Sequence, residues 1–549
     1  MPASCFGTGT FFIYMMSQDV IDEIGGRLML AFEGLEPPPR ILDWIKTRQP
    51  AGFSLFRDKN VADLTQLRDL TRDLQAAAAE AGQYPLLIAA DQEGGQLIAL
   101  GEDTTQFPGN MALGATRDSG LARRVGRAIG LEMAALGVNV NYAPDCDVNT
   151  NPDNPNVGIR SFGDDPDLVA TMGGAMIEGL QSAGVAATAK HFPGNGDSGI
   201  DPHYGVPVLA HDLQRLEAVE FQPFREAVEA GVRLMMTAHV GLPALTGRAD
   251  LPATLSSKVM KDHLRDRLGF QGLLITDALD MEAITQGAGQ IVDVIAALRA
   301  GVDLLLLTGD VEVQERIYAG LRLAFARGLV RDQDLAASAR RLLDLKEWLA
   351  GQEQPDLAVV GCQEHQRLSE TVARRAITLV RDEANLLPLK LQPEARIMAI
   401  MPRPADLTPA DTSSTLEPSM ASVLRLYHPN VDDIVVPQRP SPAEMAAVRA
   451  RASAGDLLVI GSISAHIQVE QADLVNELLA LDIPAVTVAM RTPYDLAVYP
   501  QSKTHICTYS IQPVALRALA AALWGAIPFQ GKLPVKLTTP PAQLTYSQS

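Results

Sequence analysis

The sequence has few cysteines, and they are placed so that they exclude two common kinds of stabilised fold. The four residues, Cys5, Cys146, Cys362 and Cys507, lie far apart and form no CxxC pair. A zinc ribbon or a dense disulfide framework is therefore not expected. Unpaired thiols are typical of proteins in a reducing cytosol, so the sequence predicts a cytoplasmic location.

Basic residues and long apolar runs are also scarce. The 65 acidic residues outnumber the 46 basic ones and give a formal net charge of −19. Nucleic acids and anionic membranes bind basic surfaces, so neither is expected as a partner. No segment has the roughly 18 uninterrupted apolar residues of a transmembrane helix. Phe11–Met16 is apolar but no Lys or Arg precedes Arg27, so we interpret residues 1–16 as an N-terminal extension rather than a secretory signal.

The chain is rich in short apolar runs that alternate with amphipathic stretches. At 549 residues it is too long for one ordinary domain. Between residues 17 and 350, apolar strands alternate with helical segments, which is typical of βα units and a parallel sheet. Eight such units predict a (β/α)8 TIM-type barrel as the first domain. The expected strands are Leu28–Phe32, Gly52–Phe56, Leu86–Ala90, Val138–Ala143, Ala187–His191, Arg233–His239, Gly272–Thr276 and Asp303–Leu307, with helices at Asp63–Ala79, Asp165–Ala183 and Asp212–Ala230.

A polar break at residues 351–359 is interpreted as a linker. The segment 360–549 then repeats the alternation of strands and helices and predicts an α/β sandwich domain, without fixing the order of its strands. Its expected strands are Ile397–Ile400, Leu457–Ile460, Ala485–Ala489 and His505–Tyr509, and its expected helices are Ala443–Ser453 and Pro513–Trp524.

Charged side chains follow several of the expected barrel strands. Asp91 and Asp277 each come directly after an apolar strand, and barrel enzymes carry their chemistry at the carboxyl ends of the strands. A carboxylate at Asp277 could attack an anomeric carbon, although one such residue alone could equally cap a helix. Asp280 is interpreted as a helix cap. Arg160 and Lys190 are either donors to substrate hydroxyls or partners in buried salt bridges.

The segment from Lys190 to His203 is the richest in candidate groups. Its glycines match GxGxxG, but Pro202 and Pro207 follow and no helix is expected there, so a dinucleotide site is rejected. Asp201 and His203 are two residues apart in a loop, where the carboxylate can orient the imidazole as a general acid/base. The alternative is a zinc site that uses His191, Asp197, Asp201 and His203. These residues do not show the close, regular spacing that zinc ligands usually have. We expect neither a metal nor a cofactor.

Taken together, these motifs resemble glycoside hydrolase family 3. The resemblance covers about residues 20–540 and rests on DQEGG at 91–95, NVGIRSFG at 156–163, KHFPG at 190–194 and ITDA at 275–278. In the second segment it rests on AITLV at 376–380, NLLPL at 385–389 and GKLPV at 531–535.

The resemblance implies a retaining double displacement with Asp277 as the nucleophile. It places Asp91, Arg160, Lys190 and His191 around the sugar. The Asp201 and His203 pair matches the β-N-acetylglucosaminidase branch, which releases terminal N-acetylglucosamine from cell-wall or chitin-derived oligosaccharides. The expected partner is thus a small oligosaccharide or glycoside; the oligomeric state is not predicted.

Two residues depart from the family pattern, and one of them is Asn195, which stands where the loop usually has a second His. After the paired glycines the family usually carries an Arg that helps to hold the sugar, and here that position is Ala99. The alternatives left open are a β-glucosidase, a phosphorylase that uses the same residues with phosphate as the acceptor, and a carbohydrate-binding protein without activity.

Overall fold

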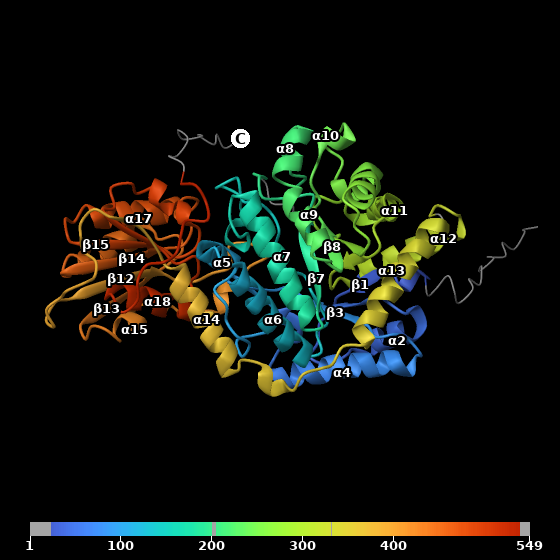
Figure 1. The fold of residues 1–549 in the computed structure, drawn as a ribbon, viewed down its shortest axis with the longest axis horizontal. Coiled ribbons are helices and arrows are strands. Elements are labelled where there is room, and N and C mark those ends of the chain that lie inside the picture. The colour runs from blue at the N-terminus through green and yellow to red at the C-terminus, as the bar shows by residue number, and fades with distance from the viewer. Residues whose placement is uncertain (1–22, 200–204, 331, 538–549) are drawn as a thin grey trace, which may run out of the picture.

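The computed structural model describes residues 23–199, 205–330 and 332–537. The expected N-terminal extension, residues 1–16, lies outside these residues. The described chain divides into a barrel with helices around it and a second α/β layer structure beside it (Figure 1). No helix in this part of the chain combines the length and apolar character needed to cross a membrane.

The first domain is the predicted (β/α)8 barrel. Its parallel strands follow one another around the sheet in chain order, and β1 pairs with β10. The Ile275↔Leu304 bridge joins β9 to β10 and brings the sheet nearly to closure. All eight expected strands are confirmed, seven with shorter bounds and β7 one residue longer at each end: β1 (Leu28–Leu30), β2 (Gly52–Ser54), β3 (Leu87–Ala90), β6 (Val140–Asn141), β7 (Ala186–Phe192), β8 (Leu234–Thr237), β9 (Leu273–Thr276) and β10 (Leu305–Leu307).

Helices surround this sheet, and a small hairpin extends from one end of it. The helices are α2 (Pro39–Arg48), α3 (Arg57–Asn60), α4 (Leu64–Glu80), α5 (Asn110–Thr116), α6 (Ser119–Ala135), α7 (Pro166–Ser182), α8 (Leu213–Ala218), α9 (Gln222–Glu229), α10 (Pro243–Thr246), η3 (Lys258–Arg267), α11 (Gln290–Ala300), α12 (Val311–Ala326) and α13 (Asp332–Ala350). Short 3-10 turns are η1 (Gly158–Arg160), η2 (Ala253–Leu255) and η4 (Gly287–Gly289), and the hairpin is β4 (Gln92–Gly94) with β5 (Leu97–Ile98).

Aspartates begin all three expected helices, with Asp212 capping the third, and the third helix is divided near a proline. The side chains of Asp63 and Asp165 accept backbone hydrogen bonds at the starts of α4 and α7, as N-cap residues do. The expected helix Asp212–Ala230 is two helices, α8 and α9. Pro223 stands in the first turn of α9. In the interior of a single long helix this proline would lose a hydrogen bond and clash with the preceding turn, so a new helix begins next to it.

The barrel interior is closed at one end by α13. Leu342, Leu345 and Leu349 of this helix pack with the side chains that fill the barrel, such as Leu87 and Ile275. A ligand can therefore enter the barrel only from the opposite end, at the carboxyl ends of the strands, where β4 and β5 lie.

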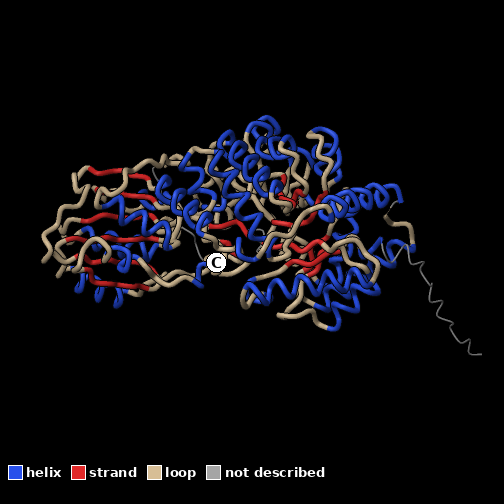
Figure 2. The backbone as a smooth tube through the Cα atoms, turned by 60° about the horizontal axis from the view of Figure 1, so that its bottom comes forward, coloured by secondary structure: helices blue, strands red, loops and turns tan. Residues whose placement is uncertain are grey.

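The second domain is a six-stranded sheet with helices on both faces (Figure 2). The strand order is β11-β16-β15-β14-β12-β13, and all neighbours are parallel except β11 with β16. Its strands are β11 (Thr378–Asp382), β12 (Ile397–Pro402), β13 (Val431–Val436), β14 (Leu457–Ser462), β15 (Ala485–Ala489) and β16 (Thr504–Cys507). Its helices are η5 (Leu357–Val359), α14 (Gln363–Ala376), η6 (Ser413–Thr415), α15 (Met420–Leu424), α16 (Pro442–Ala452), α17 (Val469–Leu479), η7 (Pro493–Ala497) and α18 (Pro513–Leu523).

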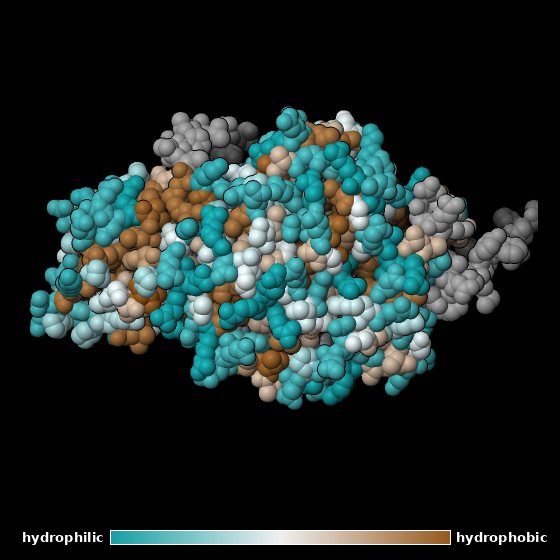
Figure 3. All heavy atoms as spheres, viewed as in Figure 1, coloured by the Kyte–Doolittle hydropathy of each residue, from teal (hydrophilic) through white to brown (hydrophobic). Residues whose placement is uncertain are grey.

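An apolar contact joins the two domains. Met111 and Ala112 of α5 pack with Tyr494 and Tyr509 of the second domain in one buried cluster. Helix α14 lies between the two bodies in Figure 1 and adds side chains to the cores of both. The face of the molecule seen in Figure 3 is mainly hydrophilic, with smaller apolar patches between the polar residues.

Candidate active site

A pocket of about 880 Å³ opens at the carboxyl ends of the barrel strands. Its size falls within the range of roughly 300–1,000 Å³ that small-molecule sites occupy. Five of the seven predicted site residues line it: Asp91, Arg160, Lys190, His191 and Asp277. The other two, Asp201 and His203, lie outside the described residues.

Three of these residues, Asp91, Arg160 and Lys190, form one buried network of ion pairs with Glu93. Glu93 accepts two hydrogen bonds from Arg160, with O···N distances of 2.8 and 3.0 Å. The Lys190 ammonium lies 2.6 Å from Glu93 and 2.5 Å from Asp91. The side chains of Arg160, Glu93 and Lys190 are at most 2% exposed, whereas that of Asp91 is 28% exposed. Asp91 is therefore the member of the network that a ligand can reach most easily.

The charges of this network determine its protonation. Burial raises the pKa of Glu93, but the adjacent cations Arg160 and Lys190 outweigh burial and lower that pKa to about 2. Burial lowers the pKa of Lys190, and the carboxylates of Asp91 and Glu93 outweigh it, so that the net shift is upward. Each charged group of the network thus lies beside a group of opposite charge.

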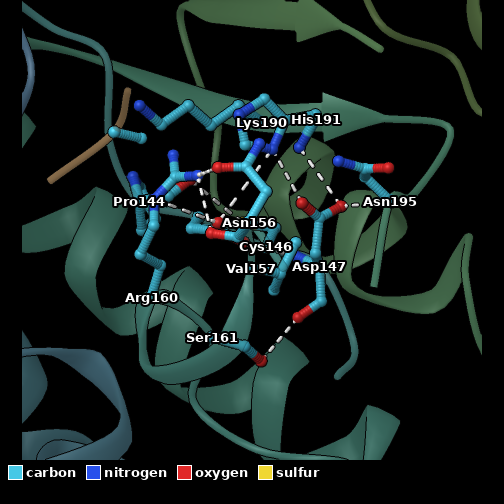
Figure 4. Close-up of polar contacts among 12 residues, drawn as sticks. Pro144, Cys146, Asp147, Asn156, Val157, Arg160, Ser161, Lys190, His191 and Asn195 are labelled. Carbon is cyan, nitrogen blue, oxygen red and sulfur yellow. Dashed lines mark hydrogen bonds and ion pairs between the residues drawn. The ribbon is translucent and has the colours of Figure 1, made fainter. Parts of the chain in front are cut away.

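His191 is held by a carboxylate that the sequence analysis did not identify. Its Nδ1 lies 2.7 Å from Oδ2 of Asp147, and the other oxygen of Asp147 accepts a hydrogen bond from the backbone N–H of Asn195, also at 2.7 Å. Figure 4 shows Asp147 between these two groups. Burial lowers the pKa of His191, but the charge and the hydrogen bond of Asp147, together with the charge of Asp145, outweigh burial and raise that pKa overall. Asp147 lies in the segment that follows β6, two residues after Asp145. This position after a barrel strand is the sequence feature that could have marked Asp147 as a site residue.

Asp277 stands at the end of β9, where its backbone N–H bonds to the carbonyl of Thr237 on the neighbouring strand. One carboxylate oxygen accepts a hydrogen bond from the N–H of Ala278 at 2.8 Å. The side chain is half-buried and lines the pocket. Asp280 is not the predicted helix cap: it accepts a hydrogen bond from the Thr308 hydroxyl at 2.6 Å, and the next helical turn begins only at Gly287.

The second domain supplies one wall of the pocket. Its segment 406–415 lies against the β4–β5 hairpin of the barrel, and residues of both line the cavity. Gln96 donates to the carbonyl of Ala410 at 2.8 Å, and the Thr412 N–H and hydroxyl both donate to the carbonyl of Gln96. Ala99 lies in the same wall. Where the family pattern has an Arg, this pocket therefore has an apolar side chain beside a segment from the second domain.

The glycine-rich segment after β7 forms a loop in its described part, and the next helix, α8, begins only at Leu213. A side chain at Gly196 would place its Cβ 1.9 Å from the carbonyl oxygen of Val148. This glycine therefore permits two loops to approach each other closely. In a dinucleotide site the glycines would instead open a helix, so the described loop is consistent with the rejection of such a site.

Of the residues proposed as an alternative metal site, the structure describes Asp197 and His191, and these two have different partners. Asp197 pairs with His211 and accepts a hydrogen bond from Thr150, whereas His191 pairs with Asp147. Asp145, Asp147 and His191 are the described residues whose ligand atoms lie close enough to hold an ion. Both carboxylate oxygens of Asp147 already accept hydrogen bonds from neighbouring N–H groups, so its contacts are those of a residue that orients a histidine.

Comparison with known proteins agrees with this geometry. The model of the glycosyl hydrolase family 3 N-terminal domain matches residues 21–345. The chain is 31% identical to beta-hexosaminidase A of Pseudoalteromonas piscicida, with 91% of each chain covered. It is 30% identical to a beta-N-acetylglucosaminidase/beta-glucosidase of Cellulomonas fimi, with 90% of each covered.

A solved structure is similar to this chain over both of its domains. A family 3 beta-N-acetylglucosaminidase from Paenibacillus sp. str. FPU-7 superposes with a TM-score of 0.89 at 36% identity, covering 94% of this chain and 99% of that one. The fold, the pocket and these relatives lead to one assignment: the chain belongs to glycoside hydrolase family 3 and is a glycoside hydrolase that acts on β-linked sugars.

Proposed function

We propose that the protein is a retaining, exo-acting β-N-acetylglucosaminidase. The observation that carries the proposal is that Asp277 shares one pocket with Asp91, Arg160, Lys190 and His191. Three relatives that are 30–36% identical over nine-tenths of the chain or more carry hexosaminidase or N-acetylglucosaminidase names, one of them together with the name beta-glucosidase, and support the choice of sugar. Cell-wall or chitin-derived oligosaccharides are the proposed substrates.

The proposed reaction is a double displacement. An oxygen of Asp277 forms a bond to the anomeric carbon while the bond from that carbon to the aglycone oxygen breaks, and the leaving oxygen takes a proton from His203. Water then gives a proton back to His203 and attacks the same carbon, which releases Asp277 and the sugar in its original β configuration. Asp201 is proposed to orient His203. The roles of these two residues rest on the family resemblance alone.

The remaining residues are proposed to bind the sugar. Asp91 accepts hydrogen bonds from hydroxyls, and Lys190 and His191 donate to them, since each lines the pocket beside the nucleophile. Arg160 holds Glu93 and thereby the shape of the site. The pocket ends blindly on the barrel core, where Met236 and Leu306 line it. A blind pocket fits removal of a terminal sugar and thus an exo mode of action.

A cytosolic location is also proposed. Cys146, Cys362 and Cys507 are free thiols in the structure, and unpaired cysteines suit a reducing compartment.

The test compares 4-nitrophenyl β-N-acetylglucosaminide with the β-glucoside, each with and without phosphate. Preferred turnover of the acetylated substrate, without stimulation by phosphate, is expected. Asp277→Asn should lower kcat by about 10⁴-fold, as removal of a residue from a covalent catalytic unit does. Asp250→Asn is the matched control, because Asp250 is an exposed partner of Arg248. Turnover of the glucoside alone, or an active Asp277→Asn enzyme, would overturn the proposal.

A further inference from the structure

The pocket has an inner half and an outer half with different chemistry. The inner half is the buried part beside the nucleophile, where Lys190 and Arg160 pair with carboxylates. The outer half is formed by residues 57–58 after β2, residues 278–281 after β9, Thr308, and the segment 406–415 of the second domain. It includes exposed side chains such as Asp58, Asp280 and Asp406.

Most of the charged side chains in the outer half are carboxylates. Asp280 accepts a hydrogen bond from the Thr308 hydroxyl. Asp406 accepts hydrogen bonds from the N–H and the hydroxyl of Ser414, at 2.7 and 2.6 Å. These donors are neutral, so they hold the carboxylates in place without cancelling their charge. Among the described residues, neither of the two carboxylates, nor that of Asp58, takes part in an ion pair.

The cations of the pocket are already paired. Arg57 is the cation that the described residues contribute to the outer half, and its guanidinium lies 2.9 Å from Glu102. Three carboxylates therefore face the outer half with no unmatched cation from the described wall. The net charge of −19 adds a negative field around the whole molecule.

We propose that the outer half of the pocket selects the aglycone by charge: it accepts a neutral or cationic sugar and rejects an anionic one. This inference rests on the proposed function, in which the aglycone leaves through the outer half. A carboxylate on the aglycone would meet like charges from both domains, whereas a hydroxyl or an ammonium group can donate to Asp280 and Asp406. The preferred substrate class is therefore a chitin-type oligosaccharide, intact or partly deacetylated.

The size of the effect follows from the number of charges. A like charge at roughly 4–8 Å in a water-like medium changes an equilibrium by a factor of about two to five. Three carboxylates acting together, with partial screening by salt, should give a discrimination of about tenfold or more at low ionic strength.

The experiment uses one disaccharide in two charge states: N-acetylglucosamine linked β-1,4 to N-acetylmuramic acid, and the methyl ester of the same compound. The two differ in the charge of one carboxyl group and share the donor sugar and the leaving oxygen. We expect kcat/KM to be about tenfold or more higher for the ester at low salt, and the ratio to shrink as salt rises. The N-acetylglucosamine disaccharide should behave like the ester.

Two variants link the ratio to the structure. Asp280→Asn with Asp406→Asn should move the ratio of ester to acid toward one, and Asp250→Asn should leave the ratio as it is. If the double variant does not fold, Asp280→Asn alone and the salt dependence of the unmodified protein give the same decision. Equal turnover of acid and ester at low salt, or faster turnover of the acid, would overturn the inference. Failure to cleave 4-nitrophenyl β-N-acetylglucosaminide would instead overturn the proposed function.

Discussion

Replacing Glu93 by Gln removes the buried negative charge that Arg160 and Lys190 share. The amide has nearly the same shape but lacks the charge, so both cations stay buried with less compensation. Arg160 keeps an oxygen of Asn156 at 3.2 Å, and Lys190 keeps Asp91. The variant should therefore be less stable, with the loss confined to the barrel.

The magnitude follows from two independent arguments. The pKa of Glu93 is lowered from 4.5 to about 2, and at about 1.4 kcal/mol per pKa unit this shift corresponds to about 3 kcal/mol of folding free energy. Breaking a buried ion pair by removing one partner costs about 3–5 kcal/mol. Because the folded-state pKa is the lower one, this stability is present above about pH 4.5 and is lost as the pH falls toward about 2.

The assay is urea unfolding followed by tryptophan fluorescence in a Trp524→Phe background. Trp524 stacks on Tyr427 in the second domain, so its removal leaves Trp44 and Trp348 as reporters of the barrel. The matched control is Glu178→Gln, because Glu178 pairs with Arg123 on the surface and such pairs contribute about 0–1 kcal/mol.

At pH 7 the free energy of unfolding of Glu93→Gln should be about 3 kcal/mol lower than that of the parent. This difference in unfolding free energy should become smaller below about pH 4.5. A loss no larger than that of the control, or a gap that stays constant as the pH falls, would refute the account of the network.

Three further predictions concern neighbouring parts of the site. Asp147→Asn removes the charge that raises the pKa of His191, so any limb of the kcat/KM profile that reports this imidazole should move to lower pH, which a pH–rate series in the parent and the variant measures. Gly114→Ala would place a Cβ 1.9 Å from a backbone carbonyl oxygen and should lower Tm, whereas Gly351→Ala, with 3.5 Å of space, should not; parallel melting curves that coincide would contradict this. Thr412→Val removes the hydroxyl that bonds to the β4–β5 hairpin and should raise KM more than it lowers kcat, since the chemical groups stay in place; steady-state kinetics with a kcat effect alone would speak against it.

The sequence predicts the barrel well because its strands are buried on both sides. Runs such as Leu87–Ala90 and Leu273–Thr276 are buried throughout and apolar except for Thr276, and their charged residues come just beyond the strand end. That arrangement fixes both the strand and the place of Asp91 and Asp277 at the barrel mouth. The four expected strands of the second domain are likewise central or fully buried ones.

In the second sheet, the strands that sequence analysis missed are the two at its edges. β13 (Val431–Val436) carries Asp432 and Asp433, and β11 (Thr378–Asp382) is only partly buried. Edge strands have one open side and tolerate charge, so they lack the continuous apolar run that marks a central strand.

Two features of the site also escaped prediction, each because it depends on contacts between distant segments. Asp147 acts on His191, which is 44 residues away in the chain, and no local pattern connects them. The wall formed by residues 406–415 comes from the other domain. Motifs identify groups within one loop, whereas the meeting of two domains depends on packing such as that of Met111 against Tyr509.

The most direct test of the central claim is to trap the covalent intermediate. The protein is incubated with a 5-fluoro-β-N-acetylglucosaminyl fluoride, and its mass and peptide map are measured. The account predicts one fluorosugar residue attached to Asp277, with no attachment in Asp277→Asn. Attachment to a different carboxylate, or turnover of β-N-acetylglucosaminides that releases an inverted sugar without any adduct, would contradict it.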